Sequence, residues 1–280
     1  MRISSRTRVC ATLLATASFA CASGALAANS VPTPAHVIIV MEENHSYSEI
    51  IGNSEAPYIN SLAKSGALFT QSYAIEHPSQ PNYLDLFSGA NQNVDGDDCP
   101  YTFKKVANEE SELLKKALTF SGYSEGLPKR GSEVCTWGEY ARKHVPWTNF
   151  TNDPGKYSLP FSSFPTNYAD LPTVSWVIPD LLDDMHDGTI AEGDTWLNTN
   201  MSAYATWAQS NNSLLIVTWD EDDGTENNRI PTIFVGQMVT PGQYSETVNH
   251  FVVLRTVEAM YGLKPLGASA GLKPITDVWN

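Results

Sequence analysis

The chain has 280 residues, enough for one large domain or two small ones, and its 17 basic and 31 acidic residues give a net charge of −14. A protein this acidic is a poor candidate for binding DNA, RNA or an anionic membrane surface, so we expect no nucleic-acid partner. Clustered carboxylates can instead bind cations.

Residues 1–27 have the features of a secretory signal peptide. Three arginines give a basic start, an apolar stretch follows, and an Ala-Leu-Ala cleavage site ends at Ala27. The apolar stretch is short and contains Thr and Ser, which argues against a membrane anchor. We therefore expect a secreted or periplasmic protein without a stable membrane anchor, with a single domain over residues 28–280. Cleavage leaves 14 basic and 31 acidic residues, a net charge of −17.

Apolar runs and helical periodicity predict alternating strands and helices along the rest of the chain. In chain order they are a strand at 37–40, helices at 57–65 and 111–120, a strand at 174–178, a helix at 195–209, strands at 214–219 and 230–235, and a helix at 250–261. This alternation indicates an α/β fold with a mainly parallel central sheet and helices on both faces. A glycine follows the first and the last helix, where it can act as a cap.

The region from about 91 to 168 does not follow this pattern. It is rich in Gly, Pro, Asn and aromatic residues, so we expect an irregular insertion over the sheet. It contains Cys99 and Cys135, the two cysteines outside the signal peptide. In an oxidising compartment such a pair indicates one disulfide, which would close a loop of about 36 residues and contribute about 3–4 kcal/mol to stability.

Polar residues follow two of the expected strands. Glu43 and Asn44 follow the first, and Asp220 and Glu221 begin a run of four acidic residues after the strand at 214–219. Sites in parallel sheets form beyond the carboxyl ends of the strands, and oxygen ligands suit hard divalent cations. The alternatives are a helix N-cap at Asn44 and a solvated acidic loop. The spacing excludes an EF-hand.

The octapeptide from Glu76 to Tyr83 places Ser79 between two prolines. Each proline restricts its own backbone and that of the residue before it, so the Ser79 hydroxyl has a fixed direction. That suits a side chain that attacks a substrate or binds a metal. The alternative is a Pro-rich surface turn.

Two histidines could complete a site. His186 lies among four aspartates between 180 and 187, either as a metal ligand or general acid or as part of a charged surface loop. His250 begins the last expected helix and could face the same rim or be structural. Residues 267–271 match G-x-S-x-G, but no acid and histidine follow in the required order, which excludes an α/β-hydrolase site.

Together these motifs resemble the bacterial phosphoesterase family that joins secreted acid phosphatases with C-type phospholipases. The motifs are Met41–Asn44, His77–Tyr83, Asp184–Asp187, Thr218–Glu221 and Asn249–His250. They are spread from about residue 36 to 263, and the resemblance is strongest to the short secreted acid phosphatases. It implies an alkaline-phosphatase-like fold.

The resemblance also implies a role for each matched residue. A divalent metal ion (Ca²⁺, Mg²⁺, Mn²⁺ or Zn²⁺) would be held by Glu43, Asn44, Ser79, Asp220 and Glu221. Ser79 would be the nucleophile that forms a phosphoseryl intermediate, His186 and His250 would face the phosphate as acids, and Asn82 and Asp184 would bind the substrate. Many members have Asp-His where this chain has Asn249–His250, which argues against a tightly held second metal.

These implications favour a phosphomonoesterase acting on small phosphate esters or lipid headgroups. C-type phospholipases of the family are longer and carry C-terminal domains, and this sequence lacks an apolar or basic run for docking on lipid. Three alternatives remain open: a phospholipase C-type phosphodiesterase, a non-catalytic cation-binding extracellular protein, and a metal-free serine esterase.

Overall fold

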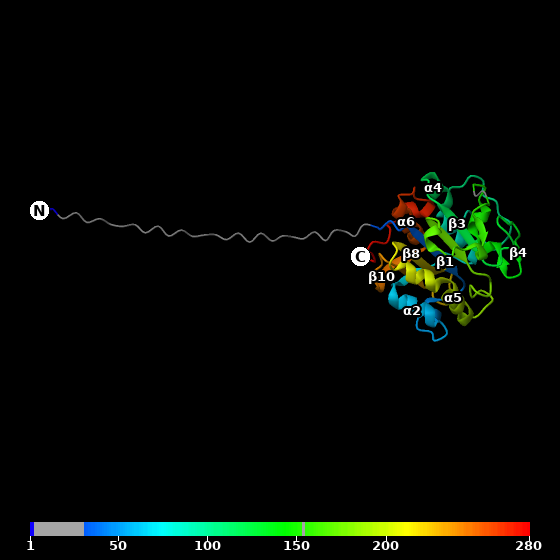
Figure 1. Cartoon of the computed structure of the whole chain (residues 1–280), viewed down its shortest axis with the longest axis horizontal. Helices are drawn as coiled ribbons and strands as arrows, with labels where there is room; N and C mark the ends of the chain where they lie inside the picture. The colour runs from blue at the N-terminus through cyan, green and yellow to red at the C-terminus, as the bar shows by residue number, and fades with distance from the viewer. Residues whose placement is uncertain (3–30, 153–154) are drawn as a thin grey trace.

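A mixed sheet of eight strands lies at the centre of the computed structural model, which describes residues 1–2, 31–152 and 155–280 (Figure 1). The strand order is β10-β2-β9-β8-β1-β7-β3-β6. The strands are β1 (His36–Glu42), β2 (Ala67–Tyr73), β3 (Phe120–Ser124), β6 (Ser158–Pro160), β7 (Val174–Ile178), β8 (Ser213–Trp219), β9 (Thr232–Gly236) and β10 (Gly242–Asn249). All pairings are parallel except those of β9 with β8 and β2. The mainly parallel sheet expected from the sequence is therefore confirmed.

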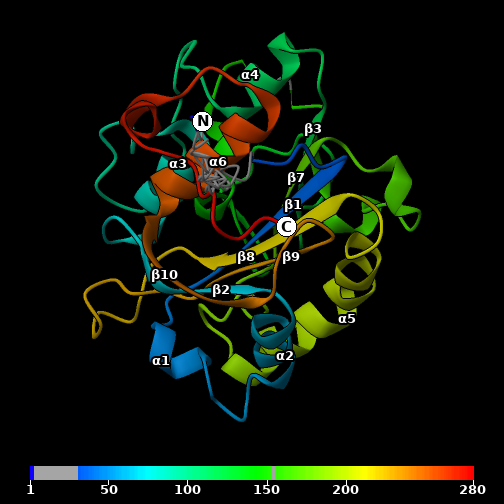
Figure 2. The ribbon, with the colours of Figure 1, turned by 90° about the vertical axis from the view of Figure 1, so that its left-hand side faces the viewer.

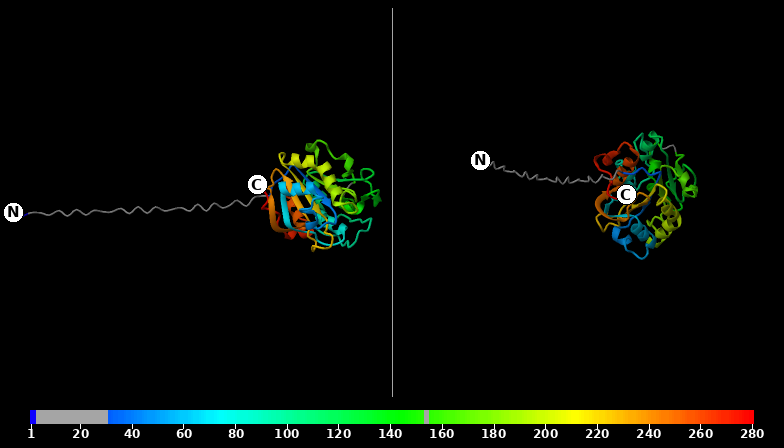
Figure 3. Two further views of the ribbon diagram at one scale, coloured as in Figure 1. Left: turned by 90° about the horizontal axis from the view of Figure 1, so that it is seen from below. Right: turned by 60° about the vertical axis from the view of Figure 1, so that its left-hand side comes forward.

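Helices cover both faces of this sheet (Figure 2). They are α1 (Tyr47–Ile50), α2 (Pro57–Ser65), α3 (Ser79–Ser88), α4 (Glu109–Lys115), α5 (Ile190–Ala208) and α6 (His250–Tyr261). One buried core contains apolar residues of α2 and α5, and the other contains those of α3, α4 and α6. Strands β2 and β10 lie side by side at one edge (Figure 3).

The predicted strands and helices outside the region from about 91 to 168 are present, but the prediction missed α1, α3, β2 and β10 there. Within that region it differs from the structure in two ways. The expected helix at 111–120 ends at Lys115, because Ala117 has a positive φ of 58° and Phe120 already begins β3. The region is also not wholly irregular, since β3 and β6 extend the central sheet and a small second sheet pairs β4 (Thr136–Trp137) with β5 (Tyr140–Ala141).

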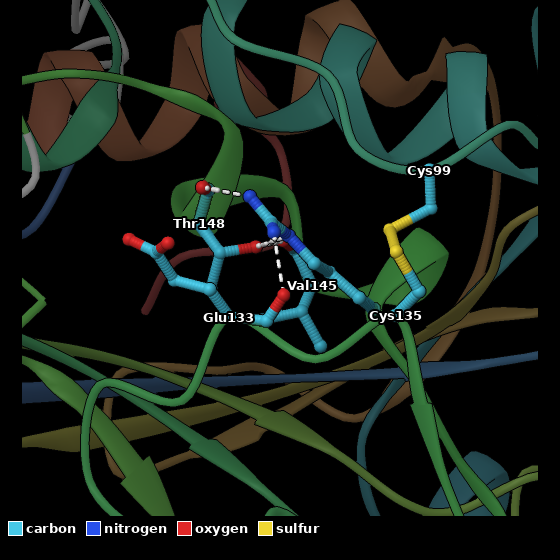
Figure 4. The surroundings of a disulfide bond; sticks show 6 residues. Cys99, Glu133, Cys135, Val145 and Thr148 are labelled. Atoms are coloured by element: carbon cyan, nitrogen blue, oxygen red, sulfur yellow. Dashed lines mark hydrogen bonds between the residues drawn. A yellow bond between two sulfur atoms is a disulfide. The ribbon is translucent and has the colours of Figure 1, made fainter.

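The predicted disulfide between Cys99 and Cys135 is present (Figure 4). Beside it, the Arg142 backbone N–H donates to the Cys135 carbonyl oxygen at 2.9 Å. The Arg142 guanidinium donates to the carbonyl oxygens of Glu133 and Thr148 and to the Thr148 hydroxyl. These bonds fix the short 3₁₀ helix η1 (Arg142–His144) against the rest of the region.

The predicted signal peptide lies almost entirely outside the described residues. Among the residues that are described, none of the helices has the length and apolar content needed to cross a bilayer.

Buried Glu109 makes the stability of the fold depend on pH. Its Oε2 accepts a hydrogen bond from Trp176 Nε1 at 2.6 Å, and burial raises the pKa of Glu109 from its usual 4.5 to about 8, against the effect of that bond. The folded chain therefore binds this proton more tightly than the unfolded chain does. The resulting stabilisation is fully present below about pH 4.5 and is lost as the pH rises through 8.

We expect Glu109→Gln to match the wild type in stability near pH 5 and to exceed it at higher pH. The difference should grow by about 1.4 kcal/mol per pH unit up to about pH 8, because glutamine needs no proton to stay neutral. Urea unfolding at several pH values measures this, with the exposed Glu55→Gln as control. A constant difference between pH 5 and 8 would show that Glu109 titrates normally.

Candidate active site

Ser79 is the first residue of α3, and the whole of that helix is buried. Its Oγ donates to Glu43 Oε2 at 2.9 Å and lies 3.2 Å from Glu221 Oε1. The sequence reading of a stiff turn was incomplete: Pro78 is the N-cap residue, and the chain turns into a helix at Ser79 itself. A helix start places the hydroxyl near the positive end of the helix dipole, which favours the approach of an anion.

Glu43 lies directly after β1. Successive side chains of a strand alternate between its faces, so Glu43 shares the α3 side of the sheet with Met41. Its Oε1 accepts a 2.6 Å hydrogen bond from Tyr83 Oη and lies 3.0 Å from His144 Nε2. Burial alone would raise the pKa of Glu43, but the charge and hydrogen bonds of these neighbours lower it to about 2. Glu43 is therefore ionised.

Asp220 follows β8, the strand that pairs with β1. Its Oδ1 accepts the backbone N–H of Asn44 at 3.0 Å, and Asn44 takes a left-handed φ of 56°, which asparagine tolerates well. Its Oδ2 is buried and has no hydrogen-bond partner among the described residues. Burial and the charges of Glu43 and Glu221 raise the pKa of Asp220 well above its usual range.

Three carboxylates thus converge on one hydroxyl with too little positive charge to balance them. The unpartnered Asp220 oxygen and the all-oxygen donor set fit a hard divalent cation. The side chains that would hold it are Glu43, Asn44, Ser79, Asp220 and Glu221. In a neighbouring group, formed by Glu43, His144 and His186, one ligand atom of each residue lies within 4.8 Å of the other two.

His144 belongs to the site although its sequence context gave no sign of this. Its Nδ1 lies 3.0 Å from Asp184 Oδ2, and its ring stacks on Tyr83 with the centroids 5.1 Å apart. Burial acts to lower the pKa of His144, but Glu43 and Asp184 on either side raise it to about 9. His144 is therefore a buried cation that partly balances the carboxylates.

Lys143 brings further positive charge to the rim, where His77 also lies. Lys143 Nζ lies 3.0 Å from Asp97 Oδ2 and 3.0 Å from His186 Nε2. His77, half exposed, pairs with Glu221 Oε2 at 2.5 Å. A hollow of about 430 Å³ beside His77 opens the site to solvent, and its lining residues are Asn44, His77, Asp222, Asp223 and Gly224.

Three predicted contacts with the substrate do not fit the geometry. Asn82 is fully buried. Its amide oxygen accepts the backbone N–H groups of residues 75 and 76, and its amide nitrogen donates to the carbonyls of residues 76 and 78. Asp184 is fully buried too, bonded to His144 and to the His186 backbone. His250 donates from Nε2 to the Asp220 carbonyl at 2.7 Å, and burial lowers its pKa to about 4. These three side chains support the site instead of facing the substrate.

Of the predicted site residues, the structure therefore brings Glu43, Asn44, Ser79, Asp220 and Glu221 together and places His186 at the rim. His250 contacts the group only through the Asp220 backbone.

Tyr83→Phe is expected to weaken the site without disturbing the packing of the ring. A hydrogen bond to a charged group is worth about 1.5–3 kcal/mol, so we expect kcat/KM to fall by about tenfold or more. Tyr140 is a matched control, because it is equally buried and its hydroxyl has no hydrogen-bond partner among the described residues. Equal losses of kcat/KM in Tyr83→Phe and Tyr140→Phe would contradict this role.

A comparison with protein families gives a match to the model of the phosphoesterase family over residues 53–264. The chain belongs to the phosphoesterase family. It is 55% identical over 257 residues to a phosphatidylinositol-3-phosphatase of Mycobacterium tuberculosis, which covers 91% of this chain and 86% of that protein. It is 28% identical to a phosphate-repressible acid phosphatase of Penicillium chrysogenum, over 75% of this chain and 55% of the relative. The phosphoesterase thus spans about half the length of that fungal enzyme.

Solved structures confirm the fold of this phosphoesterase. A protein of the alkaline phosphatase superfamily from Vibrio parahaemolyticus matches with a TM-score of 0.60 and 13% identity, over 88% of this chain and 72% of the other. Murine ectonucleotide pyrophosphatase/phosphodiesterase 5 matches with a TM-score of 0.56 and 10% identity, over 87% and 99%. The predicted alkaline-phosphatase-like architecture is therefore correct.

Proposed function

We propose that this phosphoesterase is a secreted, metal-dependent phosphomonoesterase that works through a phosphoserine intermediate. The observation that carries the proposal is the Ser79 hydroxyl within hydrogen-bond distance of Glu43 and Glu221, beside the unpartnered oxygen of Asp220. A hydroxyl bonded to carboxylates can lose its proton to one of them as it attacks.

Residues of this chain supply the nucleophile and the proton donor of the proposed reaction. Ser79 Oγ forms a bond to phosphorus as its proton passes to a carboxylate, and the bond from phosphorus to the leaving oxygen breaks. The Lys143–His186 pair at the rim holds a proton for the leaving alcohol. Water then cleaves the phosphoserine. When bound, a divalent cation would supply charge stabilisation for the phosphoryl oxygens and ease ionisation of the serine.

The substrate we infer is a phosphate monoester, including monoesters on lipid headgroups. The named activities of the relatives support this, since one is a phosphatidylinositol-3-phosphatase and another an acid phosphatase. The solvent-open rim supports it as well, because it leaves room for a leaving group of variable size.

Rates on three substrates test the assignment of substrate class. We expect p-nitrophenyl phosphate and micellar phosphatidylinositol 3-phosphate to be hydrolysed at least about tenfold faster than bis(p-nitrophenyl) phosphate. Faster cleavage of the diester, or release of phosphocholine from phosphatidylcholine, would instead favour the phosphodiesterase alternative. No hydrolysis of any ester by metal-loaded protein would favour a non-catalytic cation-binding protein.

Export is part of the proposal and rests on residues 1–27. The N-terminal sequence of protein recovered from the medium or periplasm should begin at Ala28. Recovery in the cytoplasm with residue 1 intact would contradict it.

A further inference from the structure

A second group of carboxylates lies on the other side of the sheet from Ser79. Glu125 follows β3, and Asp180 and Asp183 follow the neighbouring strand β7. One carboxylate oxygen of each lies within 4.8 Å of the other two. Asp183 also borders a hollow against α5, whereas Ser79 begins α3, which packs on the opposite face.

Glu42 supplies an independent observation beneath this group. It ends β1, and strand alternation puts it on the α5 side with Ile38 and Val40, opposite to Glu43. Its side chain is fully buried, and neither carboxylate oxygen has a hydrogen-bond partner among the described residues. Its charge interacts with those of Asp183 and Glu125. A buried, unpartnered carboxylate therefore lies close enough to Asp183 and Glu125 for their charges to act on it, as the charges of Asp184 and Glu43 also do.

The described part of the chain offers no cation paired with these carboxylates. In the described ranges 31–152 and 155–280, no Lys, Arg or His forms an ion pair with Glu42, Glu125, Asp180 or Asp183. Trp196 borders the hollow, but it carries no charge. Glu42 is buried and the three outer carboxylates are partly buried. Burying a carboxylate without a counter-charge is costly, so a bound positive ion would stabilise the arrangement.

We propose that Glu125, Asp180 and Asp183 bind a hard divalent cation of the calcium type, with Glu42 as the buried carboxylate behind it. An all-carboxylate set of oxygens is the donor set that calcium prefers, and it lacks the nitrogen or sulfur ligands that favour zinc. The site does not depend on the proposed reaction and could be present even if the phosphatase assignment failed.

The surroundings allow an ion to enter and be hydrated. A hollow of about 470 Å³ lies against α5, with Asp183, Glu192 and Trp196 in its lining. The loop that carries Asp183 packs closely on this helix at Gly193, where a Cβ would lie 3.0 Å from the Asp183 carbonyl oxygen and 2.5 Å from Met185 Cε. Water in the hollow can complete the coordination of calcium, which takes six to eight oxygens.

The cation would act on the active site through one short loop. The Asp183 backbone N–H donates to Asp180, and the Asp184 N–H donates to the Asp180 carbonyl at 2.8 Å. Asp184 in turn holds His144, and its backbone carbonyl accepts the N–H of Glu43. A cation bound at Asp180 and Asp183 would thus fix the loop that positions His144, so these carboxylates are positioning residues.

Terbium luminescence and calorimetry test the site directly. Tb³⁺ has the oxygen preference of Ca²⁺ and emits when excited through a nearby tryptophan, here Trp196. We expect a Trp-sensitised signal that excess Ca²⁺ displaces and that Trp196→Phe strongly reduces. Glu125→Gln/Asp183→Asn should weaken Ca²⁺ binding at one site by about tenfold or more. Glu139→Gln, which removes an exposed charge beside the same loop, should leave it unchanged.

Two further measurements separate this site from the one at Ser79. Glu43→Gln should keep the Trp196-dependent signal, and Ca²⁺ should raise the melting temperature of Glu43→Gln but not that of a variant that combines Glu43→Gln with Glu125→Gln/Asp183→Asn. The double variant should fold, because it removes mutual repulsion. Wild-type binding in the double variant and the same Ca²⁺-dependent rise in melting temperature in the combined variant would overturn the proposal. So would loss of the luminescence in Glu43→Gln alone.

Discussion

Replacing Ser79 with alanine is expected to lower kcat by at least about 1,000-fold on any phosphate monoester. The variant loses the only atom that can form the bond to phosphorus in the proposed reaction, while Glu43 and Glu221 keep their other partners. Rapid quenching with a ³²P-labelled substrate should trap labelled protein in the wild type and none in Ser79→Ala. Full activity in a folded, metal-loaded Ser79→Ala variant would refute the mechanism.

Ser269 provides the matched control for that experiment. It is the serine of the G-x-S-x-G match, but it is fully buried and its Oγ donates to Glu258 at 2.8 Å. Ser269→Ala should therefore lose stability and keep its turnover per folded molecule. The opposite pattern, in which Ser269→Ala abolishes activity and Ser79→Ala does not, would support a metal-free serine esterase.

Removing the divalent cation is expected to lower the activity by about 100-fold or more. Dialysis against a chelator should inactivate the protein, and adding back Mg²⁺, Mn²⁺, Ca²⁺ or Zn²⁺ singly should show which ion restores the rate. Glu43→Gln should resist restoration at the same ion concentration, because it removes the negative charge of a proposed carboxylate ligand and disrupts the pair with His144. Elemental analysis gives the amount of bound metal in each sample.

Two outcomes would count against the metal-dependent site. One is full activity after exhaustive chelation with no metal detected. The other is a Glu43→Gln variant that is restored as easily as the exposed control Glu55→Gln. If chelation lowers the melting temperature of a protein that showed no activity before chelation, the cation-binding alternative is favoured instead.

The sequence predicted the centre of the sheet better than its edges. Strands β1, β7, β8 and β9 are buried on both faces and read as continuous apolar runs. Strand β3 contains Gly122, whose missing Cβ makes room for the Trp147 ring. Because glycine is not typical of strands, the sequence of this segment does not indicate a strand on its own. Edge strand β10 is largely exposed and polar, and its hydrogen bonds to β2 are not visible in its composition.

The sequence likewise predicted only part of the candidate site. Glu43, Ser79, Asp220 and Glu221 could be found because they follow strands or lie in recognisable motifs. His144 could not, because it comes from a segment without periodicity and reaches the site only when η1 folds back on α3. The resemblance implied contacts with the substrate for Asn82 and His250, but the sequence does not show that both side chains are buried and bonded to the backbone.

The bond network around Cys135 links catalysis to the compartment in which the chain folds. Lys143 and His144 sit directly after Arg142, which is bonded to the Cys135 carbonyl and to the loop at residues 133 and 148. A chain kept under reducing conditions would lose the covalent tie to Cys99 that holds this segment. Under the proposed export, the disulfide would close only after translocation, so the segment that carries Lys143 and His144 would gain its covalent tie outside the cytoplasm.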